Sequence, residues 1–352
     1  MDSYLDRAMK RQAILERVKS GQSKDYAKVI KSIDRLIKQT LIDLDGEVSE
    51  LNFRQLNALL KQLKIDQSDI YRAGNALYAG ELSKIASISQ AQEIIDLKAT
   101  VDLGGTVLAA FTKKDLYANV LKRPLNANGR LLDTFIKDFS AGEIDRVNSA
   151  IRNGHSLGTT NQEMITQLVG TKKANYADGI LNTTRRHAEA MVRTSTQHVA
   201  SSARMETMEN NRDVTDRYKF VATLDRRTST ICRSTDGKIF ELGKGPVSPL
   251  HINCRSREIP VLSSKYDWLT KGKTRSAEGG PVSEKTNYYD WLKRQTKQDQ
   301  IDALGSKRAK LFRDGGMSTD RFSKLQLDKK FSPLTLDEMK AIEPEAFKNA
   351  GL

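Results

Sequence analysis

The sequence predicts an α+β protein that is mainly helical, with a small central α+β domain and helical N- and C-terminal regions. Apolar residues recur at helical spacing through the first 125 residues, whereas residues 218–224 alternate with the period of a half-buried strand. The chain is 38% hydrophobic, 6% aromatic and 29% charged. That balance favours extended helices over one large globule.

Residues 1–125 predict an N-terminal helical arm or bundle. We expect one helix between Gly21 and Gly46, a second around residues 56–63, and a longer one from Ser68 towards Leu97. The first helix could pack within a bundle or against a partner, and we expect part of this region to be ordered only in an assembly. Its apolar stripe consists of Tyr26, Ile30, Ile33, Ile37, Leu41 and Leu44.

Residues 126–181 predict a helical connector, preceded by breaks at residues 103–105 and 124–129. Two capping boxes, Ser140 with Glu143 and Thr160 with Glu163, predict the starts of two helices, with Gly154 and Gly158 in the turn between them. A long helix should then run from about residue 182 to 210. Its face for packing on a sheet is Ala188, Met191, Val192, Ser195, Val199, Ala203 and Met208.

Residues 182–263 predict the α+β core domain. Asp225 should end the strand at 218–224, and a turn with a short helix should occupy residues 226–235. Asp236 and Gly237 form a tight-turn dipeptide before a short strand at 238–242, and a closing strand at 257–262 should end near Pro260. This unit would bring Cys232, His251 and Cys254 close together.

Residues 264–352 predict a linker followed by a basic helical region. The segment 270–284 is rich in Gly, Lys, Ser and Thr, and a capping box at residues 335–338 predicts a final short helix. Tyr288, Tyr289 and Trp291 are expected in a core rather than on a nucleic-acid surface. The basic residues fit a phosphate-tracking face or a plain solvated face equally well. The candidate DNA contacts are Lys293, Arg294, Lys297, Lys307, Arg308, Lys310 and Arg313.

The charge and cysteine content limit the classes of partner and compartment. The formal net charge is +14, and the pI is about 9.6. This excess favours a polyanion, most simply double-stranded DNA bound without sequence specificity. No apolar run is long enough to span a membrane and no signal peptide pattern opens the chain. Two cysteines make no disulfide framework, which suits synthesis in a reducing cytoplasm.

Two strings in the core domain resemble a known family. These are L-D-R-R-T-S-x-x-C-x-x-x-D-G-K from Leu224 and P-x-H-x-x-C-R-S from Pro249. In this order they resemble the Mu protein F-like family of bacteriophage minor head proteins, with a resemblance that covers roughly the last half of the chain. The resemblance implies a virion component assembled in the host cytoplasm, in several copies, beside the portal protein or the major capsid protein. It also implies contact with the DNA genome and a role in packaging or ejection.

The resemblance also bears on the cysteines. Many family members have Cys where this chain has Ser229 and Ser256, which implies two cysteine pairs of which only Cys232–Cys254 is retained here. We therefore expect these two residues in contact or in a disulfide. A zinc site of Cys232, His251 and Cys254 is the less favoured alternative, and independent buried thiols are a third.

The residues predict no enzyme, no catalytic residue and no cofactor. A Cys/His nucleophile would need an orienting group and an oxyanion site that nothing marks. Residues 193–196 and 343–345 superficially resemble the Arg, Ser-Thr-Ser and Glu-x-Glu marks of ADP-ribosylating toxins. However, residues 193–196 lie in the middle of a predicted helix, and Pro344 stands between Glu343 and Glu345. A DNA-modifying or toxin-type enzyme, ADP-ribosyltransferase-like or nuclease-like, remains an alternative, as does a plain nucleic-acid-binding module.

A structural role is expected instead for the polar residues of the core domain. Charged and hydroxyl side chains at strand ends cap the backbone and pair with one another. We expect His251 and Arg255 to bond to Asp225 or Asp236. The whole motif is Asp225, Arg227, Thr228, Cys232, Asp236, Gly237, His251, Cys254 and Arg255.

Overall fold

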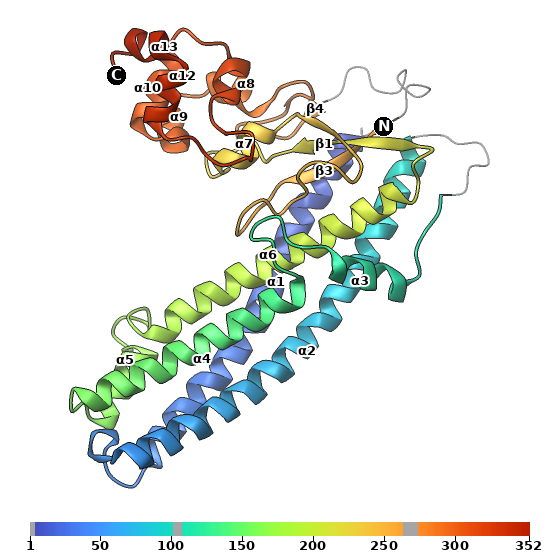
Figure 1. Ribbon diagram of the computed structural model, residues 1–352. Helices are drawn as coiled ribbons and strands as arrows, with labels where there is room; N and C mark the ends of the chain where they lie inside the picture. Colours follow the sequence, from blue (N-terminus) through green and yellow to red (C-terminus); the bar gives the residue numbers. More distant parts are fainter. Residues whose placement is uncertain (1–3, 101–107, 263–273) are drawn as a thin grey trace.

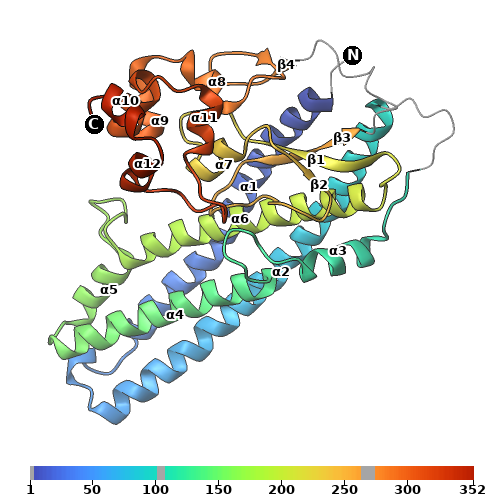
Figure 2. The same cartoon turned by 45° about the horizontal axis from the view of Figure 1, so that its top comes forward.

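The computed structural model describes residues 4–100, 108–262 and 274–352. Long helices form an elongated bundle, and a small sheet with a group of short helices lies at one end of it (Figure 1). Turning the molecule shows the strands lying across that end of the bundle, with the C-terminal helices beyond them (Figure 2). The predicted fold class, mainly helical with a small α+β part, is confirmed.

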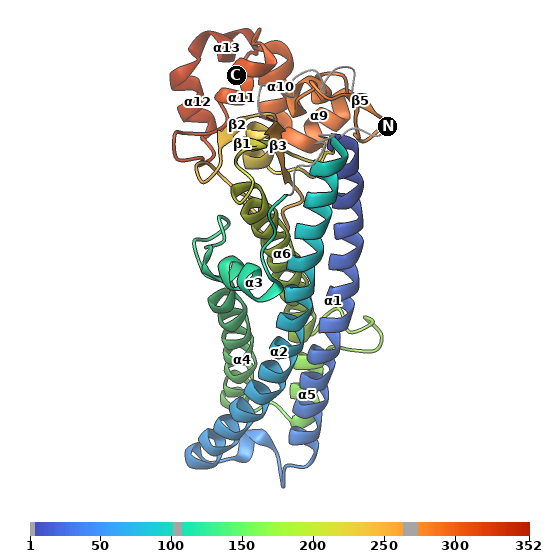
Figure 3. The same ribbon diagram turned by 90° about the vertical axis from the view of Figure 1, so that its right-hand side faces the viewer.

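Two very long helices build the N-terminal part of the bundle. α1 spans Tyr4–Ile42 and α2 spans Phe53–Thr100, joined through the short 3₁₀ helix η1, Val48–Glu50. They run side by side over most of their length (Figure 3). The predicted stripe of α1 is buried from Tyr26 to Leu41. The two predicted helices at 56–63 and 68–97 are one continuous helix.

Gly21 does not begin a helix, contrary to the prediction. It lies within α1, and a side chain placed on it would meet no atom within 4 Å. Glycine in a helix costs only about 1 kcal/mol relative to alanine, and burial of apolar residues on both sides of it outweighs that cost. Gly46, with a φ of +87°, does lie in the turn after α1.

Three helices follow α2. α3 (Lys113–Lys122) lies before the predicted connector, and α4 (Leu132–Ser156) and α5 (Asn161–Val169) lie within it. The capping box at Thr160 is confirmed. The one predicted at Ser140 is wrong, because Ser140 lies inside α4 and its hydroxyl donates to the carbonyl of Ile136. Residues 124–129 do form a turn, whereas the predicted break at 103–105 lies outside the described residues.

Helix α6, Ile180–Glu209, is the centre of the molecule. It packs against α1, α2, α3, α4 and α5, and its C-terminal part also contacts β1 and β3. Its predicted packing face is buried, but mostly against helices rather than against the sheet. The bundle thus draws on three of the four predicted segments, and the domain boundaries themselves stay a prediction.

The sheet has three antiparallel strands in the order β2-β1-β3. β1 is Thr215–Val221, β2 is Ile239–Glu241 and β3 is Arg257–Leu262. Helix α7, Thr230–Thr235, begins after Ser229, whose side chain caps it. Pro260 does not end β3 as predicted but pairs with Tyr218 inside it. An edge strand tolerates proline because one side of its backbone makes no ladder hydrogen bonds.

The C-terminal region has its own core. A two-stranded ribbon of β4 (Thr274–Arg275) and β5 (Val282–Ser283) precedes six short helices. Tyr288, Tyr289 and Trp291 are buried at its centre, as predicted. The helix predicted to be last is followed by one more. These helices are α8 (Tyr288–Lys293), α9 (Lys297–Leu304), α10 (Ser306–Asp314), α11 (Thr319–Lys324), α12 (Leu336–Ile342) and α13 (Pro344–Asn349).

Candidate functional site

Asp225, in the loop after β1, and Arg255, just before β3, form a two-pronged ion pair. Nη1 and Nη2 of Arg255 donate to the two carboxylate oxygens at 2.5 and 2.8 Å. The same carboxylate accepts from the Thr228 hydroxyl at 3.1 Å and from the backbone N–H of Arg227 at 3.0 Å. Burial alone would raise the pKa of Asp225, but these donors, Arg255 foremost, lower it. The predicted Asp225–Arg255 bond is confirmed.

Asp236 has a different partner from the one predicted. Its carboxylate accepts from Nη1 and Nη2 of Arg275 at 2.9 and 2.7 Å and from the backbone N–H of Ala222 at 2.7 Å. Both charged side chains are fully buried. Neither His251 nor Arg255 bonds to it among the described contacts, because Arg255 is paired with Asp225. Gly237, with a φ of +81°, completes the turn.

Arg275 was missed because it lies in the stretch that the composition predicts as a linker. The guanidinium also donates to the carbonyl oxygens of Ala222 and Thr286, at 2.5 and 3.0 Å. It therefore ties the β4–β5 ribbon to β1 and α8. Sequence reasoning had one usable signal, a lone arginine among small residues, but its partner lies 39 positions away.

The two cysteines and His251 meet between α7 and the loop that precedes β3. The Sγ atoms of Cys232 and Cys254 are 3.6 Å apart, and both thiols are free. One potential ligand atom from each of the three residues lies within 4.8 Å of the other two. The predicted contact is confirmed, as a thiol pair and not as a disulfide. The predicted bond of His251 to an aspartate is wrong, since its Nδ1 contacts the backbone oxygen of Ile252 at 2.7 Å.

The two thiols differ in their electrostatic surroundings. Burial raises the pKa of Cys232 well above its usual value, and the neighbouring Cys254 adds to the effect. Burial would also raise the pKa of Cys254, but hydrogen bonds from Cys232 and His251 lower it well below the usual value. Burial would lower the pKa of His251, but Cys254 raises it above the ordinary value. These surroundings favour the thiolate form at Cys254 over Cys232.

A buried polar contact joins this loop to the first helix. Nζ of Lys19, on α1, donates to the backbone oxygen of Cys254 at 3.2 Å and to Oε1 of Gln197 at 2.6 Å. Gln197 in turn donates to the backbone oxygen of Ser256 at 2.8 Å. Burial lowers the pKa of Lys19 to about 8. Nothing in the local sequence marks Lys19, because its partners come from two other parts of the chain.

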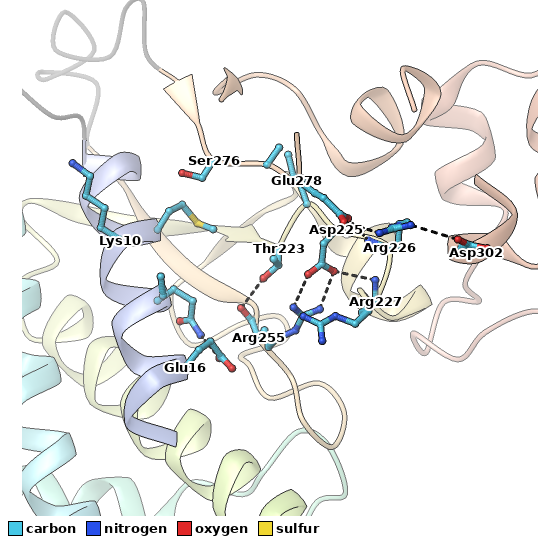
Figure 4. A pocket seen from close by; sticks show the side chains of 15 residues that line it. Lys10, Glu16, Thr223, Asp225, Arg226, Arg227, Arg255, Ser276, Glu278 and Asp302 are labelled. Atoms are coloured by element: carbon cyan, nitrogen blue, oxygen red, sulfur yellow. Dashed lines mark hydrogen bonds and ion pairs between the residues drawn. The ribbon is translucent and has the colours of Figure 1, made fainter. Parts of the chain in front are cut away.

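A cavity of about 820 Å³ lies between the start of α1 and the Asp225 loop (Figure 4). Its walls carry several charges, and some of these pair with one another. Arg255 bonds to Asp225, and Arg226 contacts Glu278 at 3.0 Å and Asp302 at 3.5 Å. The predicted motif residues thus divide between ion pairs at strand ends and the cysteine–histidine cluster.

The seven predicted DNA contacts differ in availability. Lys293, Arg294, Lys297 and Lys307 are exposed. Arg308, by contrast, donates to the backbone oxygen of Leu334 at 2.5 Å. The partly buried residues are Arg308, Lys310 and Arg313.

The comparisons identify the central segment. Residues 145–259 match the sequence profile of the family described as Phage Mu protein F like protein. The matched segment runs from within α4 into β3 and contains α6, β1 and the cysteine–histidine cluster, so the predicted resemblance is confirmed there. The chain therefore carries a phage Mu protein F-like domain, which indicates a phage head morphogenesis protein.

No curated protein and no solved structure gave a significant match. Within the described residues, no helix has both the length and the apolar character that a membrane crossing requires.

Proposed function

We propose that this protein is a phage minor head protein, a structural component of the virion that lies near the portal and contacts the DNA genome during packaging or ejection. The observation that carries the proposal is the match of residues 145–259 to the Phage Mu protein F family. A family of phage structural proteins is consistent with a role without catalysis.

The use of charge in the domain supports a structural role. Asp225 and Asp236 each bind a guanidinium through two bonds, and each also accepts a backbone N–H. Carboxylates so fully occupied hold chain segments together and have little capacity left to act as a general base. The ADP-ribosyltransferase alternative gains no support either, because Thr194, Ser195 and Thr196 are buried within α6.

The far end of the bundle offers a surface for a capsid or portal protein. Three large apolar side chains, Ile42, Phe53 and Leu157, are 65%, 71% and 80% exposed where α1 ends, α2 begins and α4 ends. The exposed basic residues of α8 to α10 lie at the other end, with the sheet (Figure 1). One end can therefore contact protein while the other contacts DNA.

Affinity capture from assembling particles tests the proposal. The tagged protein is recovered at low and at high salt, and the portal and coat bands are quantified. Portal protein recovered in both conditions supports the proposal, since an apolar contact resists salt. Recovery of nucleic acid alone, all of it released by salt, would overturn the portal role and leave a nucleic-acid-binding module.

A matched pair of variants locates the protein contact. Phe53→Asp with Leu157→Asp should abolish portal recovery without unfolding the bundle, because both side chains are exposed. The control pair, Lys61→Asp with Lys114→Asp, changes exposed residues of α2 and α3 and should leave recovery unchanged.

A further inference from the structure

The cluster of Cys232, His251 and Cys254 has the composition of a soft metal site. Among the described residues it is the one group of three or more His, Cys, Asp or Glu side chains whose ligand atoms converge, all within 4.8 Å. Thiolate and imidazole are the ligands that zinc prefers in proteins. The residues come from two segments, α7 and the loop 251–254, so a shared ion would join them.

The spacing of the sulfur atoms fits an ion between them. Two thiolates on one tetrahedral zinc, each about 2.3 Å from the metal, lie about 3.8 Å apart. The Sγ atoms of Cys232 and Cys254 are 3.6 Å apart. A disulfide would need about 2.05 Å.

The ring of His251 is oriented as a ligand. Its Nδ1 lies 2.7 Å from the backbone oxygen of Ile252. A carbonyl oxygen can only accept, so Nδ1 carries the proton and Nε2 of the neutral ring keeps its lone pair. Zinc-binding histidines commonly donate their other ring N–H to a carbonyl oxygen in this way, because the bond fixes both the tautomer and the ring.

The surroundings give an ion access to the site. They also leave one of its four coordination positions open. Both cysteines are buried, whereas Ile252 and Asn253 are exposed, so the loop lies at the surface. The hydroxyls of Ser229 and Ser256 are hydrogen-bonding neighbours of Cys232. Either hydroxyl, or a water, can complete a tetrahedron.

We propose that Cys232, His251 and Cys254 bind one zinc ion, which clamps the loop 251–254 onto α7. The clamp also fixes the domain on the bundle. Lys19 of α1 donates to the oxygen of Cys254, and the N–H of Asn253 donates to Thr194 of α6 at 3.0 Å. The site is independent of the proposed role in the phage head, because it depends only on these contacts.

Metal content and cobalt substitution test the site in the full-length reduced protein. Zinc should bind at one ion per chain. Cobalt(II) should give the visible bands of tetrahedral coordination together with thiolate-to-cobalt charge-transfer bands. Zinc should also raise the unfolding temperature, since an ion that binds only the folded chain stabilises it.

Variants assign the ligands. His251→Ala and Cys254→Ser should each weaken zinc binding more than about a hundredfold, beyond the loss that follows removal of a group that only orients a ligand. Ser229→Cys or Ser256→Cys should tighten binding, because each places a thiolate beside the open position. His155→Ala is the matched control, since His155 bonds to the oxygen of Leu51 at the far end of the bundle and should leave affinity unchanged.

The wild-type protein alone can overturn the proposal, even if a variant fails to fold. Absence of stoichiometric metal in the reduced chain would do so, as would a cobalt spectrum without charge-transfer bands. A Cys232–Cys254 disulfide in protein recovered from a reducing cytoplasm would also refute it, because the bond would occupy both ligands.

Discussion

At the scale of single residues, buried charge is the main risk to stability in this protein. The Asp236–Arg275 pair lies wholly inside, where an isolated charge would cost several kcal/mol. The pair is tolerated because the oxygens of Ala222 and Thr286 and the N–H of Ala222 add further hydrogen bonds to it. The sequence marked Asp236 as structural but could not name its partner.

Removing Asp236 should therefore be severe. We expect Asp236→Ala to lower the free energy of unfolding by about 3–5 kcal/mol, because it leaves the buried guanidinium of Arg275 without its charged partner. Urea unfolding followed by circular dichroism measures the change. Adding Arg275→Met should recover part of the loss, and a double variant no more stable than the single one would refute this explanation.

An exposed aspartate provides the control for this experiment. Asp216 lies on β1 with its side chain 64% exposed, next to Arg217. Asp216→Ala should change the free energy of unfolding by no more than about 0.5 kcal/mol.

His198 should make stability depend on pH. It is buried in α6, and burial lowers its pKa to about 4 from the ordinary 6.5, with the charge of Arg123 also lowering it. The unfolded chain then binds the proton more tightly. The contribution of neutral His198 is full above pH 6.5 and is lost as the pH falls towards 4, by about 3 kcal/mol in all.

Unfolding measured from pH 7 down to pH 4 checks this expectation. His198→Asn should flatten the pH dependence over that range, because an amide of similar shape does not titrate there. His187→Asn is the control, since His187 is partly exposed and already bonded to Glu143. If the His198 variant keeps the pH dependence of the wild type, another group must cause the loss of stability at low pH.

At the scale of elements, identical local signals had different outcomes. Ser140 with Glu143 and Thr160 with Glu163 have the same spacing, yet only Thr160 starts a helix. Ser140 is buried against α2 and shares a hydrogen bond with Asn75. Because α4 packs continuously on α2, the helix continues through Ser140 despite the capping-box pattern there.

The cap at Thr160 gives an element-scale prediction. Thr160→Ala removes the acceptor for the N–H of Glu163 and should cost about 1 kcal/mol. Thermal unfolding should show a lower midpoint than the wild type. Gln162→Ala, an exposed change in the same first turn, should leave the midpoint nearly unchanged.

At the scale of the whole molecule, charged contacts join the bundle to the sheet. Glu93 of α2 accepts from the hydroxyl of Tyr4 and from Arg257 of β3. Arg204 of α6 lies 3.5 Å from Glu258 on the same strand. The sheet is therefore fixed to two separate helices of the bundle.

The predicted DNA surface also belongs to this scale. Changing four exposed residues to glutamine should weaken non-specific binding to double-stranded DNA and flatten its salt dependence, by about 0.9 in slope for each phosphate that is no longer neutralised. Fluorescence anisotropy across a salt series measures both quantities. The residues changed are Lys293, Arg294, Lys297 and Lys307.

An equal reduction of charge elsewhere separates local binding from net charge. Four exposed lysines of the helical bundle changed to glutamine should reduce the slope much less. Equal effects of the two sets would mean that binding responds to total charge and not to this surface. The control residues are Lys24, Lys31, Lys61 and Lys114.

The sequence by itself determined the class of fold, the long helices, the three strands and the Mu protein F-like segment. Each of these depends on periodicity or on residues near one another in the chain. Even so, the predicted end of the central strand at Asp225 was wrong, because β1 spans Thr215–Val221. The contact of Cys232 with Cys254 was also predictable, because the resemblance placed both residues in one compact unit.

Only the tertiary structure decided the partners of buried charges and the extent of the helices. Arg275, which pairs with Asp236, lies in a stretch predicted to be a linker. Lys19, which donates a hydrogen bond to the backbone oxygen of Cys254, lies in the first helix. Gly21 and Ser140 lie inside helices, although glycine at 21 and the capping-box pattern at 140 predicted helix ends there. The physical reason is the same throughout: burial against distant segments outweighs local preferences of about 1 kcal/mol, and those segments cannot be read from neighbouring residues.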